Sequence, residues 1–181
     1  MNDKVHLRVG RATYPLKRLC FLADFFNLME VESLSEVSKK IGMSNQALAY
    51  NFKRDDINVS HIYKILNSYG YDIKFEFVNN NSDNSTQIKE DTKTITRVAD
   101  NVESNLNDIS YFNTKLFCIH YAITKFGLSR ADIYSKVGIC RQVFVRRLQC
   151  DDCPLSMLTD IASNFGWTLK IDIKKKEIAT A

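Results

Sequence analysis

The chain has 181 residues, of which 45% are hydrophobic and 25% charged, and its formal net charge at pH 7 is +4. This length suits one ordinary domain or two small ones, and this composition supports a globular core. No apolar run approaches the roughly 20 residues of a membrane-spanning helix, and no N-terminal stretch resembles a signal peptide. We therefore expect a soluble, cytoplasmic protein whose five cysteines are reduced thiols.

The charge is unevenly distributed. Residues 1–77 carry 11 basic and 9 acidic side chains, a balance of +2, and residues 111–181 carry 11 and 6, a balance of +5. The intervening residues 78–110 carry 3 and 6, a balance of −3. Two basic parts separated by an acidic one suit an anionic partner such as nucleic acid, without requiring one.

The two basic parts are also similar in sequence. Residues Val37–Phe77 align without a gap on Ile133–Ile173, at an offset of 96. Identical residues recur at Gln46 and Gln142, among others, and apolar positions keep their character. Such self-similarity indicates one supersecondary unit used twice.

We call residues 1–78 the first copy and residues 111–181 the second copy, and predict that each is a domain. Residues 79–110 are polar and poor in large apolar side chains, which is typical of a flexible linker, with a short helix near 95–105.

Each copy is predicted to begin with a densely apolar helix, over Leu16–Met29 and Thr114–Phe126. Before the first of these, Val5, Leu7 and Val9 alternate with polar residues, which indicates a strand.

A helix start follows in each copy. Ser33-x-x-Glu36 is a capping box, and Ser129-x-x-Asp132 is its shorter relative. The helices that they open are predicted to end at Gly42 and Gly138, where glycine suits a positive φ.

The rest of each copy contains two further helices and a strand. A third helix is predicted over 45–53 and 141–149, with a buried stripe at Leu48 and Phe52 or at Phe144 and Leu148. An Asp-Asp turn, expected to cap or shape the start of the next helix, precedes a fourth helix that ends at Gly70 or Gly166. Period-two alternation then predicts half-buried strands over 71–77 and 167–173.

A short helix, a glycine turn and a second short helix form the helix-turn-helix pattern. The segment Ser33–Leu48 resembles the lambda-repressor-like (Cro/XRE) DNA-binding domain: Ser38 is the small residue at the helix crossing, Gly42 the turn glycine and Leu48 a core residue. The resemblance covers about residues 14–70 and 114–166, and the strands are additions to the common domain. It implies a mainly α fold of two tandem lambda-repressor-like helix-turn-helix domains, each followed by a β-strand that can pair.

The resemblance also implies which residues face DNA. Residues three, four and eight beyond the turn glycine face the major groove, and here these are Asn45, Gln46, Tyr50, Arg141, Gln142 and Arg146. Asn and Gln can bond adenine bidentately, and Arg can bond guanine. Contacts to phosphate are expected from flanking residues and capped helix starts, namely Ser33, Lys40, Ser44, Asn51, Lys53, Arg54, Ser129, Lys136 and Arg147.

The second copy departs from the family pattern at Tyr134, which stands where Ser38 stands in the first. Its bulk is expected either to push the two helices apart or to point outward after a small rotation.

Other chemistry finds little support. Cys150-Asp151-Asp152-Cys153 could be a redox pair or half of a zinc site, but Cys153 aligns with the apolar Ile57, and the setting is not thioredoxin-like. There is no Ser/His/Asp order and no glycine-rich phosphate loop. We expect no enzyme, no metal and no cofactor.

The sequence therefore predicts sequence-specific binding of double-stranded DNA by a transcriptional regulator of bacterial or phage type. Apolar strand faces add the prediction of strand-mediated self-association, within or between chains. The alternative is a protein-interaction module, such as an antitoxin or phage adaptor, that uses the same fold without reading DNA. RNA binding ranks lower because no aromatic stacking platform is visible.

Overall fold

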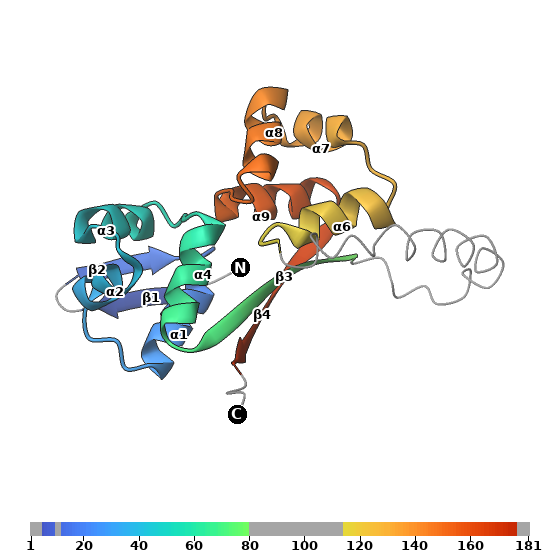
Figure 1. Ribbon diagram of the computed structural model, residues 1–181. Helices are drawn as coiled ribbons and strands as arrows, with labels where there is room; N and C mark the ends of the chain where they lie inside the picture. The colour runs from blue at the N-terminus through green and yellow to red at the C-terminus, as the bar shows by residue number, and fades with distance from the viewer. Residues whose placement is uncertain (1–4, 10–11, 80–113, 177–181) are drawn as a thin grey trace. The chain divides into compact units, whose positions relative to one another are not determined.

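The computed structural model describes residues 5–9, 12–79 and 114–176. Helices predominate within these ranges, accompanied by two two-stranded sheets (Figure 1). The first copy contains β1 (Val5–Val9), β2 (Ala12–Leu16), α1 (Cys20–Leu28), α2 (Leu34–Ile41), α3 (Asn45–Lys53), α4 (Val59–Ser68) and β3 (Tyr71–Asn79). The second contains α6 (Phe117–Lys125), α7 (Arg130–Val137), α8 (Arg141–Gln149), α9 (Leu155–Asn164) and β4 (Trp167–Lys175).

The repeat recurs at the level of the elements. Each of α2, α3, α4 and β3 begins and ends 96 residues before α7, α8, α9 and β4, respectively. The predicted bounds of α3 and α8 are confirmed, and both strands run two residues beyond their predicted ends. The predicted linker and its short helix lie almost entirely outside the described residues.

The N-terminal strand is confirmed, but it has a partner that the sequence analysis missed. β1 pairs antiparallel with β2, and Leu7 lies opposite Tyr14. Leu7 and Leu16 are fully buried, so this hairpin closes one side of the core of the first copy. The prediction of a helix from Leu16 is therefore wrong, because Leu16 ends a strand and α1 begins only at Cys20.

The start of α1 is set by a distant carboxylate. Asp55 accepts hydrogen bonds from the backbone N–H groups of Lys17, Arg18 and Leu19 at 2.9, 2.9 and 3.0 Å. Those donors have no partner inside a helix that begins at Cys20, and Asp55 satisfies them. Asp151 does the same for Lys115 and Leu116 in the second copy, so these two aspartates cap the first helix of their copy rather than the fourth.

The turn between the second and third helices is the same in both copies. Gly42 has φ of 68° and Gly138 has φ of 72°, as predicted for a glycine just past a helix end. The N–H of Met43 bonds the carbonyl of Ser38, which closes the end of α2. Each third helix therefore starts three residues after a left-handed glycine.

Of the two predicted capping boxes, the second is confirmed and the first is only half formed. Ser129 and Asp132 form the complete, reciprocal box at the start of α7. At α2, Ser33 accepts from the N–H of Glu36, but the Glu36 carboxylate lies 2.9 Å from the Lys40 ammonium instead. Only the serine half of the box is therefore present in the first copy.

Tyr134 does not change the length of its helix. α7 has the same eight residues and the same C-terminal glycine conformation as α2, while the half-buried Tyr134 ring lies 6.2 Å from the Phe144 ring. Ser38, its equivalent, is buried at 3% exposure and donates to the carbonyl of Ser35. The two helices differ instead in how many of their residues are buried. Four residues of α2 are buried, whereas Ile133 is the one buried residue of α7.

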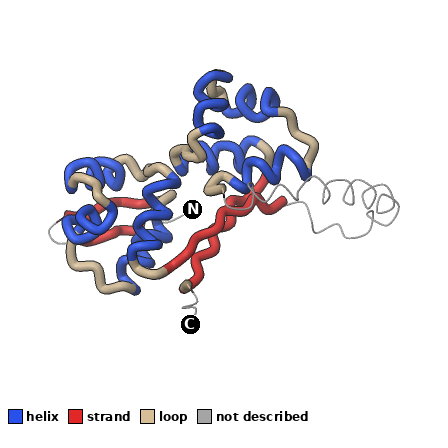
Figure 2. Tube along the Cα trace, viewed as in Figure 1, coloured by secondary structure: helices blue, strands red, loops and turns tan. Residues whose placement is uncertain are grey.

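The strands that follow the fourth helices pair with one another, as the two long red strands of Figure 2 show. The N–H of Lys176 bonds the carbonyl of Gly70 at 2.8 Å, and the rings of Phe77 and Trp167 lie 5.5 Å apart. Ile73, Phe75 and Phe77 are buried, as the alternation predicted for this strand.

Contacts divide the chain into two compact units. One contains the described residues up to Ile73 with Cys153–Ser156 and the residues from Ile173, and the other contains Lys74–Asp152 and Met157–Asp172 where described. Inside the first unit, the N–H of Val59 bonds the carbonyl of Cys153 at 2.8 Å, and the N–H of Leu155 bonds the carbonyl of Ile57 at 2.9 Å. The two bonds are equivalent, because Val59 and Ile57 of the first copy align with Leu155 and Cys153 of the second.

The second aspartate of the first turn acts within the same unit. Asp56 accepts from the N–H of Ser156 at 3.0 Å and from its hydroxyl at 2.7 Å. It therefore caps the residues that open α9, rather than α4 as predicted. None of the described helices is long and apolar enough to cross a membrane.

Candidate nucleic-acid interface

Helix α3 is held by one buried stripe and one cap. Leu48 and Phe52 are fully buried, and the Ser44 hydroxyl accepts from the N–H of Ala47 at 3.2 Å. The stripe occupies one side of the helix, so Asn45, Gln46 and Tyr50 are exposed on the other sides. Tyr50 is 58% exposed, which is unusual for so large an aromatic side chain.

Helix α8 is built in the same way with a looser anchor. Phe144 is fully buried, but Leu148, the equivalent of Phe52, is only half-buried. Cys140 stands at the cap position and makes no side-chain cap bond. Arg141, Gln142 and Arg146 are all exposed.

The six residues predicted to contact bases are thus all at the surface. Among the described residues, the side chains of Asn45, Gln46, Arg141, Gln142 and Arg146 have no hydrogen-bond or ion-pair partner. The Tyr50 ring lies 5.6 Å from the guanidinium carbon of Arg54. These donors and acceptors are available to a ligand at little cost in intramolecular bonds.

The residues predicted to contact phosphate fall into two groups. Ser33, Ser44 and Ser129 use their hydroxyl oxygens as helix caps. Lys53 and Arg54 are exposed at the end of α3, whereas Asn51 and Arg147 are half-buried. Asn51 is oriented toward Met43, with its amide nitrogen 4.0 Å from the sulfur.

Lys40 is less available than the sequence suggests. Its ammonium lies 2.9 Å from the Glu36 carboxylate and 3.8 Å from the centre of the Tyr69 ring. The hydrogen bond with Glu36 raises the pKa of Lys40, and the same bond lowers the pKa of Glu36. Tyr69 contacts both Lys40 and Glu36, and burial raises the pKa of its hydroxyl. A phosphate would compete with Glu36 for this lysine.

The second copy also places a cation over an aromatic ring, but Asp132, the equivalent of Glu36, bonds Ser129 instead. Lys136 lies 4.3 Å from the centre of the Phe165 ring, at the positions equivalent to Lys40 and Tyr69. Such contacts are worth about 0.5–1 kcal/mol at exposed sites.

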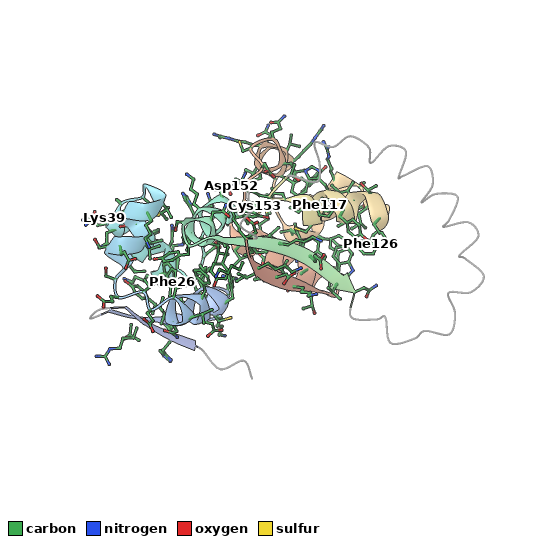
Figure 3. The ribbon with its side chains drawn as sticks, turned by 60° about the horizontal axis from the view of Figure 1, so that its bottom comes forward. Phe26, Lys39, Phe117, Phe126, Asp152 and Cys153 are labelled. Atoms are coloured by element: carbon green, nitrogen blue, oxygen red, sulfur yellow. The ribbon has the colours of Figure 1, made fainter. Side chains whose placement is uncertain are left out.

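Three exposed residues were missed by the sequence analysis. Lys39 extends outward from α2 (Figure 3) and makes no ion pair within the described residues, so it is a freer cation than Lys40. Ala47 and Val143 are exposed between the predicted base-contacting positions, and Val143 is 45% exposed. Both residues lie outside the buried stripes of Leu48 and Phe144, and this spacing could have predicted their exposure. Apolar side chains at such positions can contact a thymine methyl group.

The cysteines differ widely in how exposed they are. Cys153 is fully buried in the apolar position that the alignment assigned to it, and Cys150 is exposed. Burial raises the pKa of the Cys118 thiol to about 12, so this cysteine stays protonated. The part of the chain that the structure describes contains no group of three or more side chains placed to hold a metal ion.

Comparison with protein-family models, with characterised proteins and with solved structures found no match to this chain.

Proposed function

We propose that this chain binds double-stranded DNA in a sequence-specific manner through two lambda-repressor-like helix-turn-helix domains, and that it acts as a transcriptional regulator. The observation that carries the proposal is the shared construction of α3 and α8. Each is a nine-residue helix that begins three residues after a left-handed glycine and exposes unbonded polar side chains at the same positions.

The side chains suit the task. A helix of this size fits the major groove of B-DNA, where each base pair presents a distinct pattern of donors and acceptors. Asn45, Gln46 and Gln142 can each donate and accept at one adenine, and Arg141 and Arg146 can each donate twice to one guanine. A solvated helix face without function would not need the same amide at Gln46 and Gln142.

Cations flank the same helices. Positive charge on or next to these helices comes from Lys53 and Arg54 at the end of α3, from Arg147 on α8 and from Lys39 on the preceding helix α2. Contacts of this kind supply most of the affinity of a protein for DNA and make it salt-dependent.

Salt dependence therefore tests the proposal. We expect the affinity of the full chain for duplex DNA to fall steeply with salt, with a logarithmic slope of about −0.9 for each phosphate neutralised. Arg147→Ala should reduce that slope by about 1. Lys64→Ala removes the same charge from an exposed position on α4 and serves as the matched control. Affinity that does not change with salt would contradict the proposal.

One observation favours the alternative of a protein-interaction module. The Trp167 ring lies 4.9 Å from Phe126 and 5.0 Å from Phe165, and Phe126 is 38% exposed. Partly exposed aromatic side chains are enriched at protein interfaces. Under this alternative, Phe126→Ala would abolish partner binding while the α3 and α8 variants would not.

A further inference from the structure

The two exposed helices are alike in geometry but differ in chemistry. α3 and α8 have the same length, the same preceding turn and a buried residue at the same central position, Leu48 or Phe144. Glutamine is kept at one position, in Gln46 and Gln142. At three other positions arginine replaces a neutral residue, in the pairs Asn45/Arg141, Tyr50/Arg146 and Asn51/Arg147.

The charge of the two helices differs accordingly. α3 carries one cation, Lys53, which is its last residue. α8 carries three, Arg141, Arg146 and Arg147, and no acidic residue. Arg141 and Arg146 are exposed and have no acidic partner among the described residues, so their charge is not neutralised within the chain.

This difference changes which base each helix can bind. The amide of Asn45 both donates and accepts, as adenine N7 and N6–H require. A guanidinium only donates, so Arg141 cannot accept from adenine N6–H, but it fits the two acceptors N7 and O6 of guanine. Tyr50 has one hydroxyl and cannot make the paired donation that Arg146 can make.

We propose that the DNA element of this chain is asymmetric, with two unlike halves. The first copy selects adenine through Asn45 and Gln46. The second copy selects guanine through Arg141 and Arg146, and adenine at the position that Gln142 contacts. This inference rests on the proposed DNA binding, and it excludes the inverted repeat of identical halves that two equivalent recognition helices would select.

The test is a selection from random duplex DNA with the full chain and two helix-exchange variants. Arg141→Asn with Arg146→Tyr gives α8 the residue types of α3, and Asn45→Arg with Tyr50→Arg does the reverse. All four positions are exposed, so the variants should fold, and unfolding curves check this. Lys125→Asn with Lys170→Asn removes two positive charges from outside α8 and is the control.

We expect the unchanged chain to enrich a site with one adenine-containing and one guanine-containing half. The α8 variant should lose the guanine preference of one half by roughly 5- to 150-fold per base, with the other half unchanged. The α3 variant should gain guanine in the other half, and the control should keep the original site.

The outcomes separate this inference from the proposed function. If the unchanged chain enriches no sequence at all, DNA recognition itself is wrong. If it enriches two identical halves, or one half alone, DNA recognition stands and the asymmetric element is wrong. If the α8 variant keeps its guanine preference, Arg141 and Arg146 do not select the base, and the inference fails.

Discussion

The Oδ1 atom of Asp55 lies 3.0 Å from the backbone nitrogen of Leu19, 36 residues earlier in the chain. The second copy repeats this relationship between Asp151 and Leu116, also at 3.0 Å. In both copies a carboxylate from the end of the third helix therefore fixes the start of the first helix. Both aspartates adopt positive φ, 53° and 47°, a conformation that aspartate and asparagine tolerate better than most residues.

Removing the Asp55 carboxylate should destabilise the protein. Asp55→Ala leaves three N–H donors unpaired and places alanine at positive φ, so we expect a loss of about 1–3 kcal/mol in the free energy of unfolding. Asp55→Asn keeps one acceptor oxygen and should cost less. Asp24→Ala, at an exposed position of α1, should stay within about 0.5 kcal/mol. Urea unfolding measures all three, and equal effects of Asp55→Ala and Asp24→Ala would contradict this account of the cap.

Trp167 is the one tryptophan of the chain, so its fluorescence reports directly on the paired strands. Its ring lies within 5.5 Å of the Phe77, Phe126 and Phe165 rings. Because it is half-buried, we expect Trp167→Ala to cost about 2–3 kcal/mol, somewhat less than the same change in a core. Trp167→Phe keeps most of the packing and should cost less than half as much. Circular dichroism during thermal unfolding measures both, and an unchanged midpoint for Trp167→Ala would show that this cluster adds no stability.

Glu36→Gln should strengthen DNA binding while slightly weakening the fold. The change releases Lys40 from its ion pair and removes one negative charge near the candidate interface. The lost pair spans one helix turn at the surface, where water screens it, so the fold should lose little stability. We expect tighter binding to duplex DNA and a steeper salt slope. Glu32→Gln, an exposed position with the same change of charge, is the control. If both variants tighten binding equally, net charge explains the effect and the Lys40 pair does not.

His120 should make stability depend on pH. Burial is the main cause that lowers its pKa from the ordinary 6.5 in the folded chain, with Asp151 opposing and Arg130 assisting. The unfolded chain therefore binds the proton more readily, so stability is lost as pH falls below about 6.5. We expect His120→Gln to remove this part of the change in urea midpoint between pH 7.5 and pH 5.5. His6→Gln, at an exposed position, should leave it intact. Equal pH dependence in the wild type and His120→Gln would refute the assignment.

The elements that local signals define were predictable from the sequence. α3 and α8 were predicted to the residue because a preceding glycine and a four-residue apolar spacing agree. The positive φ of Gly42 and Gly138 was also predictable, because glycine is the residue that most often follows a helix end in this conformation.

The features that depend on distant contacts were not predictable. The apolar run through Leu16 suits a helix, but pairing with β1 and the bonds to Asp55 override that local preference. The Glu36 carboxylate could bond either the backbone of Ser33 or the ammonium of Lys40. The Ser-x-x-Glu pattern does not show which of the two it bonds, and in the structure it bonds Lys40. For the candidate interface, the six residues predicted to contact bases are exposed, and their contact with DNA stays a prediction. The ion pair of Lys40 and the exposure of Lys39 and Val143 required the structure.

The most direct test of DNA recognition compares three glutamines. Gln46 and Gln142 occupy the shared position that is predicted to contact a base, and Gln149 is exposed at the end of α8 outside it. We predict that Gln46→Ala and Gln142→Ala each reduce the ratio of affinities for the selected site and for a site changed at one adenine by roughly 5- to 150-fold, with Gln149→Ala unchanged. If neither Gln46→Ala nor Gln142→Ala changes that ratio, these helices do not read DNA bases.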